Sequence, residues 1–343
     1  MQNPKKHVLL ILRLAVAVGA LAWVLGQQDW AELAAAFGNL KLGAFGTGLL
    51  VFALAQVVLA LRWWLLLCAQ RVHLTLLVAV RLHFLGLFYN NLMPSSVGGD
   101  FLRAWYVTKH TEKRFEAALS VFVDRAVGLS GIFLMALVAY FSLRRGLTLD
   151  PIFHPPQDSG AARDIGPQVV GYLCLSVLLL LTLVLLIGSS RAFLAKHWAG
   201  KRDYLKSLVL KAKRVVLAYC RRPWVVLLTL CLTLFLQAST IVAFWVVGRS
   251  IGMEAHLKYY FLIFPTMWVV AALPVSIAGI GVLEGGITVL FTSLTGATSE
   301  QAACLALCQR FIWILTSLPG VAIHLSGGHL PKSFSFDVHS NAE

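Results

Sequence analysis

The sequence predicts an all-α polytopic membrane protein. Of its 343 residues, 59% are hydrophobic and 13% are charged, and the mean hydropathy is +0.79. Several apolar runs reach the roughly 20 residues that a helix needs to cross a hydrocarbon core. Lipid offers the backbone no hydrogen bonds, so runs of this length favour helices over the short alternating strands of a membrane barrel. The runs cover residues 8–26, 44–67, 74–92, 117–143, 168–188, 224–248, 259–278 and 302–325.

The first run follows Lys5, Lys6 and His7, as the apolar part of a signal peptide would. It is longer than the apolar segment of most signal peptides, which has about 7 to 15 residues. Further apolar runs also follow it. We therefore expect an uncleaved first membrane helix.

The net charge of +14 is concentrated in one place, because residues 191–222 form a Lys- and Arg-rich stretch between two apolar runs. Short basic loops of this kind usually stay in the cytoplasm, where anionic lipid headgroups are their natural partner. The charge therefore indicates membrane topology and contact with anionic lipid. We expect no nucleic-acid partner.

Two re-entrant hairpins resolve a conflict in this topology. Eight complete crossings would place the basic stretch 191–222 outside. The conflict disappears if residues 74–106 enter from the cytoplasm and return there, with a break at Asn90–Pro94, because proline cannot donate a helical hydrogen bond. Residues 259–295 form a second hairpin from the other side, broken between Pro274 and Gly281. The prediction is six crossings and two broken hairpins, with both termini in the cytoplasm.

This topology contains an inverted repeat within a single integral domain, residues 1–330. Repeat A covers about 44–143 and repeat B about 224–325, and each has the order span, hairpin, span. Inverted repeats with paired broken helices are typical of secondary transporters, in which they build a site at the membrane midplane. Residues 331–343 are predicted to be a short disordered cytoplasmic tail.

Ionised residues inside the predicted spans and hairpins are the candidates for function. Each costs at least about 2.5 kcal/mol at bilayer depth unless it is paired. One interpretation is structural, with the carboxylates paired to arginines. The other is that Arg103, Arg125 and Arg310 hold a phosphate headgroup while the carboxylates hold cations or protons. Arg62 and Arg71 are assigned to a cytoplasmic loop. The candidate substrate-binding residues are Asn90, Asn91, Ser95, Ser96, Asp100, Arg103, Asp124, Arg125, Ser276, Glu284 and Arg310.

Four segments together resemble the flippase-like transmembrane domain of lysylphosphatidylglycerol synthases and its free-standing relatives. The resemblance extends from about residue 5 to 330 and implies translocation or handling of lipids in a prokaryotic cytoplasmic membrane. In the full synthases a cytosolic domain transfers lysine to the lipid. Only a short tail follows the last run here, so we do not carry that activity over. The segments are NNLMPSSVGGDFLR (90–103), DRAVGL (124–129), PVSIAGIGVLEG (274–285) and residues 310–320 with their LPG ending.

The sequence leaves other functions open. A polytopic glycosyltransferase with a polyprenyl-phosphate donor would need an acidic metal-binding pair on an outer loop, for which Asp29 and Glu32 are available. A third function is an accessory scaffold for a glycolipid or polyprenyl-lipid pathway. Homo-oligomers are also open. The six cysteines form no CxxC pair and have no His partners at metal-ligand spacing, so we expect no metal, cofactor or catalytic residue.

Overall fold

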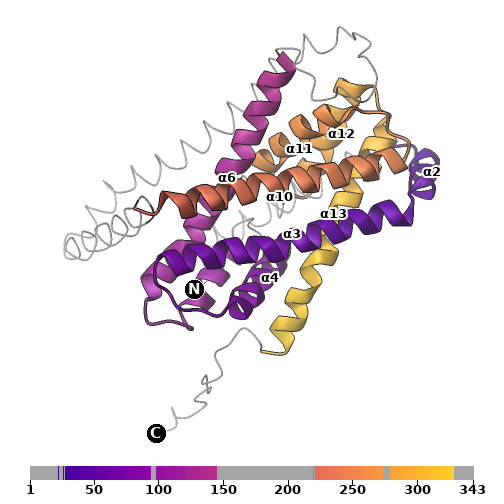
Figure 1. Ribbon diagram of the computed structural model, residues 1–343. Helices are drawn as coiled ribbons and strands as arrows, with labels where there is room; N and C mark the ends of the chain where they lie inside the picture. Colours follow the sequence, from indigo (N-terminus) through magenta and orange to yellow (C-terminus); the bar gives the residue numbers. More distant parts are fainter. Residues whose placement is uncertain are drawn as a thin grey trace, which may run out of the picture.

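The computed structural model describes residues 28–93, 98–144, 221–272 and 279–327, together with residues 22, 26 and 219. All regular elements in this part of the chain are helices (Figure 1). The predicted span 168–188 and the tail 331–343 lie outside the described residues, as does nearly all of the span 8–26 and of the basic stretch 191–222.

The described helices follow the order that the hydropathy predicts, with one short helix before the second span. Four are long and apolar enough to cross a membrane: α3, α6, α10 and α13. The all-α polytopic fold class is therefore confirmed. The helices are α2 (Trp30–Asn39), α3 (Leu42–Ala69), α4 (Leu76–Leu92), α5 (Gly98–Val107), α6 (Arg114–Arg144), α10 (Pro223–Ser250), α11 (Leu257–Ala272), α12 (Val282–Thr295) and α13 (Ser299–Leu325).

Both predicted hairpins consist of two short helices separated by a break. The first break begins later than expected, because α4 stays helical through Leu92 and the backbone becomes extended at Met93. The second lies between α11 and α12, where Gly279 and Gly281 have φ values of +71° and +80°. Only glycine adopts such angles at little cost, so these two residues allow the chain to turn into α12.

The two units, α3–α6 and α10–α13, are packed in a symmetric way. Helix α3 packs on α10, and the two run in opposite directions (Figure 1). Helix α4 packs on α13, while α11 packs on α6. If each helix of one unit is replaced by the corresponding helix of the other, the same pairs of helices are in contact. Because each hairpin rests on the last helix of the other unit, the units interlock and form one body.

The larger core is centred on the second unit and contains several packed aromatic rings. Phe244 of α10 stacks on Phe264 of α11, with ring centroids 5.0 Å apart and an interplanar angle of 9°. Tyr260 meets Phe291 of α12 edge to face at 4.7 Å. Aromatic pairs in these geometries add about 0.5–1.5 kcal/mol beyond area burial. A smaller core, around Trp63 and Leu82, lies where the first hairpin packs against α3 and α6.

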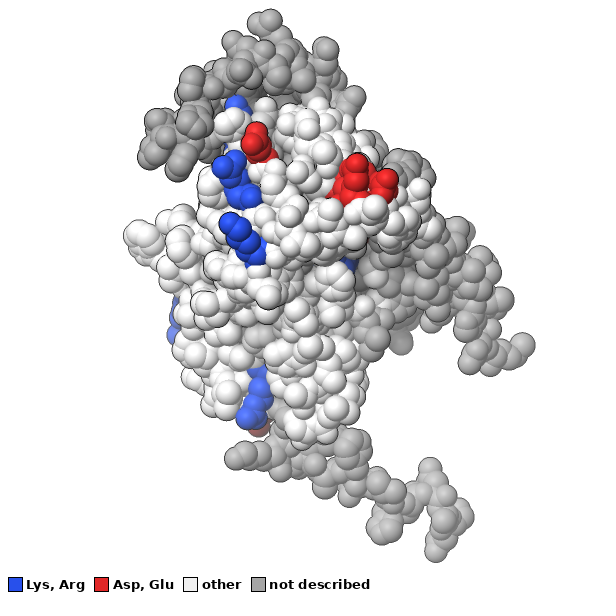
Figure 2. All heavy atoms as spheres, turned by 90° about the vertical axis from the view of Figure 1, so that its right-hand side faces the viewer, with Lys and Arg blue, Asp and Glu red and all other residues white. Residues whose placement is uncertain are grey.

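One face of the molecule carries few charges. Figure 2 shows one face on which most of the described surface is uncharged, with the acidic groups gathered mainly towards its upper part. Large apolar side chains such as Leu50, Leu54 and Phe235 are more than half exposed. An apolar surface of this kind belongs against lipid.

Gly320 of α13 sets how closely that helix approaches α4. A Cβ atom at this position would collide with the Phe84 carbonyl oxygen and lie 2.6 Å from Phe88 Cβ. We predict that Gly320→Ala destabilises the protein by about 1–3 kcal/mol, as overpacking does, and lowers the Tm measured in detergent. Gly46→Ala in α3 is the control, because a Cβ there has no atom within 4 Å. Equal Tm values for the two variants would contradict the close packing.

Candidate functional site

The carboxylate of Asp124, in the middle of α6, is bound by two arginines. Oδ1 accepts from Arg62 Nε at 2.9 Å and lies 2.8 Å from Arg62 Nη2. Oδ2 accepts from Arg103 Nη2 at 2.8 Å. All three residues are at most 5% exposed. One buried carboxylate therefore links α3, α5 and α6.

Further polar contacts surround these arginines. Arg62 Nη1 donates to Thr233 Oγ1 of α10 at 2.7 Å. The Arg103 guanidinium lies over the Trp63 ring, 4.3 Å from its centroid, and Arg103 Nη1 is 3.3 Å from His83 Nδ1. Arginine can only donate, so His83 Nδ1 accepts and its proton lies on Nε2. Nε2 then donates to Gln56 Oε1 at 3.1 Å, which identifies His83 as neutral.

A second ion pair lies beside this cluster. Asp100 Oδ2 of α5 is 3.3 Å from Arg125 Nη1 of α6. The Asp100 side chain is 9% exposed, whereas that of Arg125 is 36% exposed. This pair therefore lies between the buried cluster and the outside of the helix bundle.

The third ion pair is in the second unit. Glu284 Oε1 accepts from Arg310 Nε at 2.5 Å, and Glu284 Oε2 accepts from the Gly281 backbone N–H at 2.7 Å. Glu284 thus caps the start of α12 and pairs with α13 at the same time. The Arg310 guanidinium carbon lies 5.6 Å from the centroid of the Trp313 ring.

The Asp100–Arg125 and Glu284–Arg310 pairs occupy equivalent positions. Each carboxylate lies two residues after the first residue of its helix, Gly98 in α5 or Val282 in α12. Each arginine lies eleven residues after the start of α6 at 114 or of α13 at 299. The structural interpretation, in which these carboxylates pair with arginines, is confirmed. Their role in substrate binding stays a prediction.

Of the five neutral residues predicted to bind substrate, the structure describes Asn90 and Asn91. Asn90 Oδ1 accepts from the Gly99 backbone N–H at 2.9 Å and ties α4 to α5 across the break. Asn91 is part-buried, and its Nδ2 has no hydrogen-bond partner among the described residues. The candidates Ser95, Ser96 and Ser276 lie outside the described residues.

Arg62 was wrongly assigned to a cytoplasmic loop. It is 5% exposed, within α3, and it forms the centre of the charged cluster with Asp124. The signal was present in the sequence, because Arg62 falls inside the apolar run 44–67. His83 and Gln56 were also missed. Neither carries a formal charge, and nothing local in the sequence distinguishes them from other polar residues in apolar helices.

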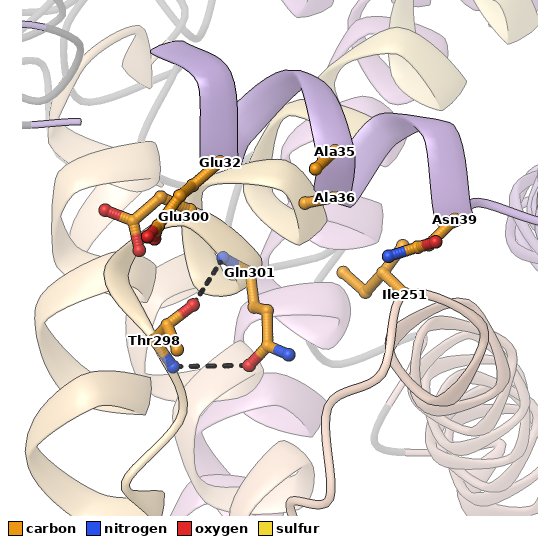
Figure 3. Close-up of a pocket in the computed structure, with 8 residues that line it drawn as sticks. All are labelled: Glu32, Ala35, Ala36, Asn39, Ile251, Thr298, Glu300 and Gln301. Carbon is orange, nitrogen blue, oxygen red and sulfur yellow. Dashed lines mark hydrogen bonds between the residues drawn. The ribbon is translucent and has the colours of Figure 1, made fainter. Parts of the chain in front are cut away.

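A small surface pocket lies away from these ion pairs. Figure 3 shows it between α2 and the start of α13, with Glu32 on one side and Thr298 and Gln301 on the other. The last two residues exchange hydrogen bonds of 3.2 Å and cap α13. Asp29 caps α2 by accepting from the Ala31 and Glu32 backbone N–H groups. The acidic pair required by a glycosyltransferase therefore has one member occupied as a helix cap.

These observations define a class of protein: a polytopic helical membrane protein with two broken hairpins and ion pairs buried between its helices. The chain belongs to the family of the lysylphosphatidylglycerol synthase TM region, which matches residues 10–320. It is also similar to a UPF0104 membrane protein of Methanothermobacter thermautotrophicus, with 20% identity over 72% of this chain and 75% of that protein. No solved structure matches the chain significantly. The resemblance seen in the sequence is thereby confirmed.

The charge balance around Asp124 leads to a stability prediction. Asp124→Asn leaves two buried guanidiniums without their shared counter-charge, and breaking a buried ion pair typically costs about 3–5 kcal/mol. Arg62→Gln leaves a balanced Arg103–Asp124 pair and is expected to destabilise less. Thermal unfolding in detergent measures both. Glu116→Gln, in the first turn of α6, is the control for the loss of one negative charge. A smaller loss for Asp124→Asn than for Arg62→Gln would refute the prediction.

Proposed function

We propose that the protein translocates a lipid with an anionic headgroup between the leaflets of a prokaryotic cytoplasmic membrane. The observation that carries the proposal is the equivalence of two ion pairs, Asp100–Arg125 and Glu284–Arg310. Each joins the second helix of a hairpin to the last helix of the same unit. Transporters with inverted repeats place substrate sites at such broken helices. Membership of the lysylphosphatidylglycerol synthase TM region family supports a role with lipids.

The arginines are suited to a phosphate headgroup. A guanidinium forms paired hydrogen bonds to phosphate, which are among the strongest that a protein makes. The helices α5 and α12 begin inside their hairpins, and helix N-termini favour anions. In this mechanism the headgroup replaces a carboxylate as partner of the arginine. The carboxylate takes its place again when the lipid leaves, so the arginine keeps a counter-charge throughout.

Two equivalent sites also suit alternating access. If each hairpin opens to one leaflet, exchanging the conformations of the two units changes the leaflet from which the site is reached. Similar ion pairs on both sides keep the two states close in free energy, as a transporter requires. We place both termini in the cytoplasm, because the basic stretch 191–222 belongs on that side.

Lipid movement in liposomes tests the proposal. The purified protein should accelerate the loss of fluorescent phosphatidylglycerol from the outer leaflet, measured by dithionite quenching. Arg125→Gln and Arg310→Gln should each slow this movement by about tenfold or more, since a hydrogen bond to a charged group contributes about 1.5–3 kcal/mol. The control is Arg114→Gln, which removes an exposed charge at the start of α6.

Two results would count against translocation. One is wild-type protein that moves neither phosphatidylglycerol nor any other anionic phospholipid faster than empty liposomes. The other is movement that survives both arginine substitutions in correctly folded protein. Reconstitution levels and Tm values are measured for each variant, so that loss of the fold is separated from loss of movement.

A further inference from the structure

The two units share a scaffold but differ in charge. Residues of the two units correspond when they lie the same number of positions after the first residue of corresponding helices. By this count, the four buried residues that surround Asp124 or include it have neutral counterparts in the second unit. Two of these counterparts, Phe264 and Ile287, are buried in the larger core, and the other two, Ala243 and Gln309, are also buried. The counterparts of Arg62, His83, Arg103 and Asp124 are, in order, Ala243, Phe264, Ile287 and Gln309.

This difference leaves the first unit with an excess positive charge. Among the residues that the structure describes, its ion-pair groups are three arginines, at positions 62, 103 and 125, and two carboxylates, at 100 and 124. His83 is neutral, as its hydrogen bonds require. The net charge is thus +1, whereas Glu284 and Arg310 of the second unit sum to zero. Excess charge in a membrane interior is unfavourable unless an anion accompanies it.

One guanidinium atom within the cluster still has hydrogen-bonding capacity. Arg103 Nε is buried and has no partner in the part of the chain that the structure describes. Arg103 itself is 4% exposed. A buried donor without a partner is costly, so it indicates a place where another acceptor can bind. The free donor thus belongs to one of the two arginines that share the Asp124 carboxylate.

The surface beside the cluster is suited to acyl chains. Phe101 and Trp105 lie one helical turn apart on α5 and are 60% and 59% exposed. Phe122 of α6 meets Phe101 edge to face at 5.7 Å and is 40% exposed. Arg125, on the next turn of α6, is the most exposed of the ion-pair residues of the first unit. An apolar surface thus lies beside Arg125, which is partly exposed.

We propose that the cluster of Arg62, Arg103 and Asp124 binds the phosphodiester of an anionic phospholipid, whose single negative charge neutralises the excess. The assignment of a lipid, in place of free phosphate, rests on the proposed function. Phe101 and Trp105 contact its acyl chains. The described residues of the second unit hold no cluster of this kind, so the tighter lipid site lies at the first hairpin.

Native mass spectrometry of the detergent-purified protein tests this proposal by measuring the Kd for added lipid. Phosphatidylglycerol should bind at least about tenfold more tightly than phosphatidylcholine, a factor of ten corresponding to 1.4 kcal/mol. Arg62→Gln, which makes the cluster neutral, should remove this preference, and Arg62→Lys should retain most of it. Arg114→Gln, which removes an exposed charge from α6, should bind as wild type does.

Three results would overturn the proposal: equal binding of the two lipids, an unchanged preference in Arg62→Gln, or saturation by inorganic phosphate at the same concentration as the lipid. If Arg62→Gln does not fold, Asp100→Asn provides the test, because it raises the net charge and should tighten phosphatidylglycerol binding. The assay requires no transport. Selective binding without movement would reject only the proposed function, and movement without selective binding would reject only this inference.

Discussion

The carboxylate of Asp124, shared by two guanidiniums, is the interaction on which the arrangement of the first hairpin depends. In lipid the hydrophobic effect does not drive helices together, so association relies on packing and on polar contacts. Arg62 contacts Asp124 on α6 and Thr233 on α10, while Arg103 brings in α5. Four helices thus meet around one buried carboxylate. The cost of an unpaired charge keeps them there.

Outside this cluster the two units are held by close packing. Gly99 faces the Gly86 carbonyl, Gly248 faces the Tyr260 hydroxyl, and Gly320 faces the backbone of α4. Small residues of this kind let membrane helices approach closely. In its described residues the second unit has no counterpart of the Asp124 cluster, and it is filled by the stacked rings around Phe264. The fold is therefore repeated, whereas the means of stabilising it is not.

The hairpins were predicted well because their signals are local. Residues 74–106 and 259–295 correspond to the helix pairs Leu76–Val107 and Leu257–Thr295. Proline, glycine and the distribution of basic residues gave these limits. The buried position of Arg62 was missed because the topology prediction counted every arginine near the end of a run with the adjacent loop. A long side chain near a helix end can equally well point inwards to a partner on another helix.

The sequence by itself determined the apolar helices, the breaks between them and which charges had to be accounted for, because hydropathy and backbone preferences act over neighbouring residues. Tertiary structure alone decided the partners of Asp124, which lie 62 and 21 residues away along the chain. It also decided the tautomer of His83 and the charge difference between the units. These features depend on which helices meet, and in a membrane the pairing of distant buried charges is settled only when the helices pack.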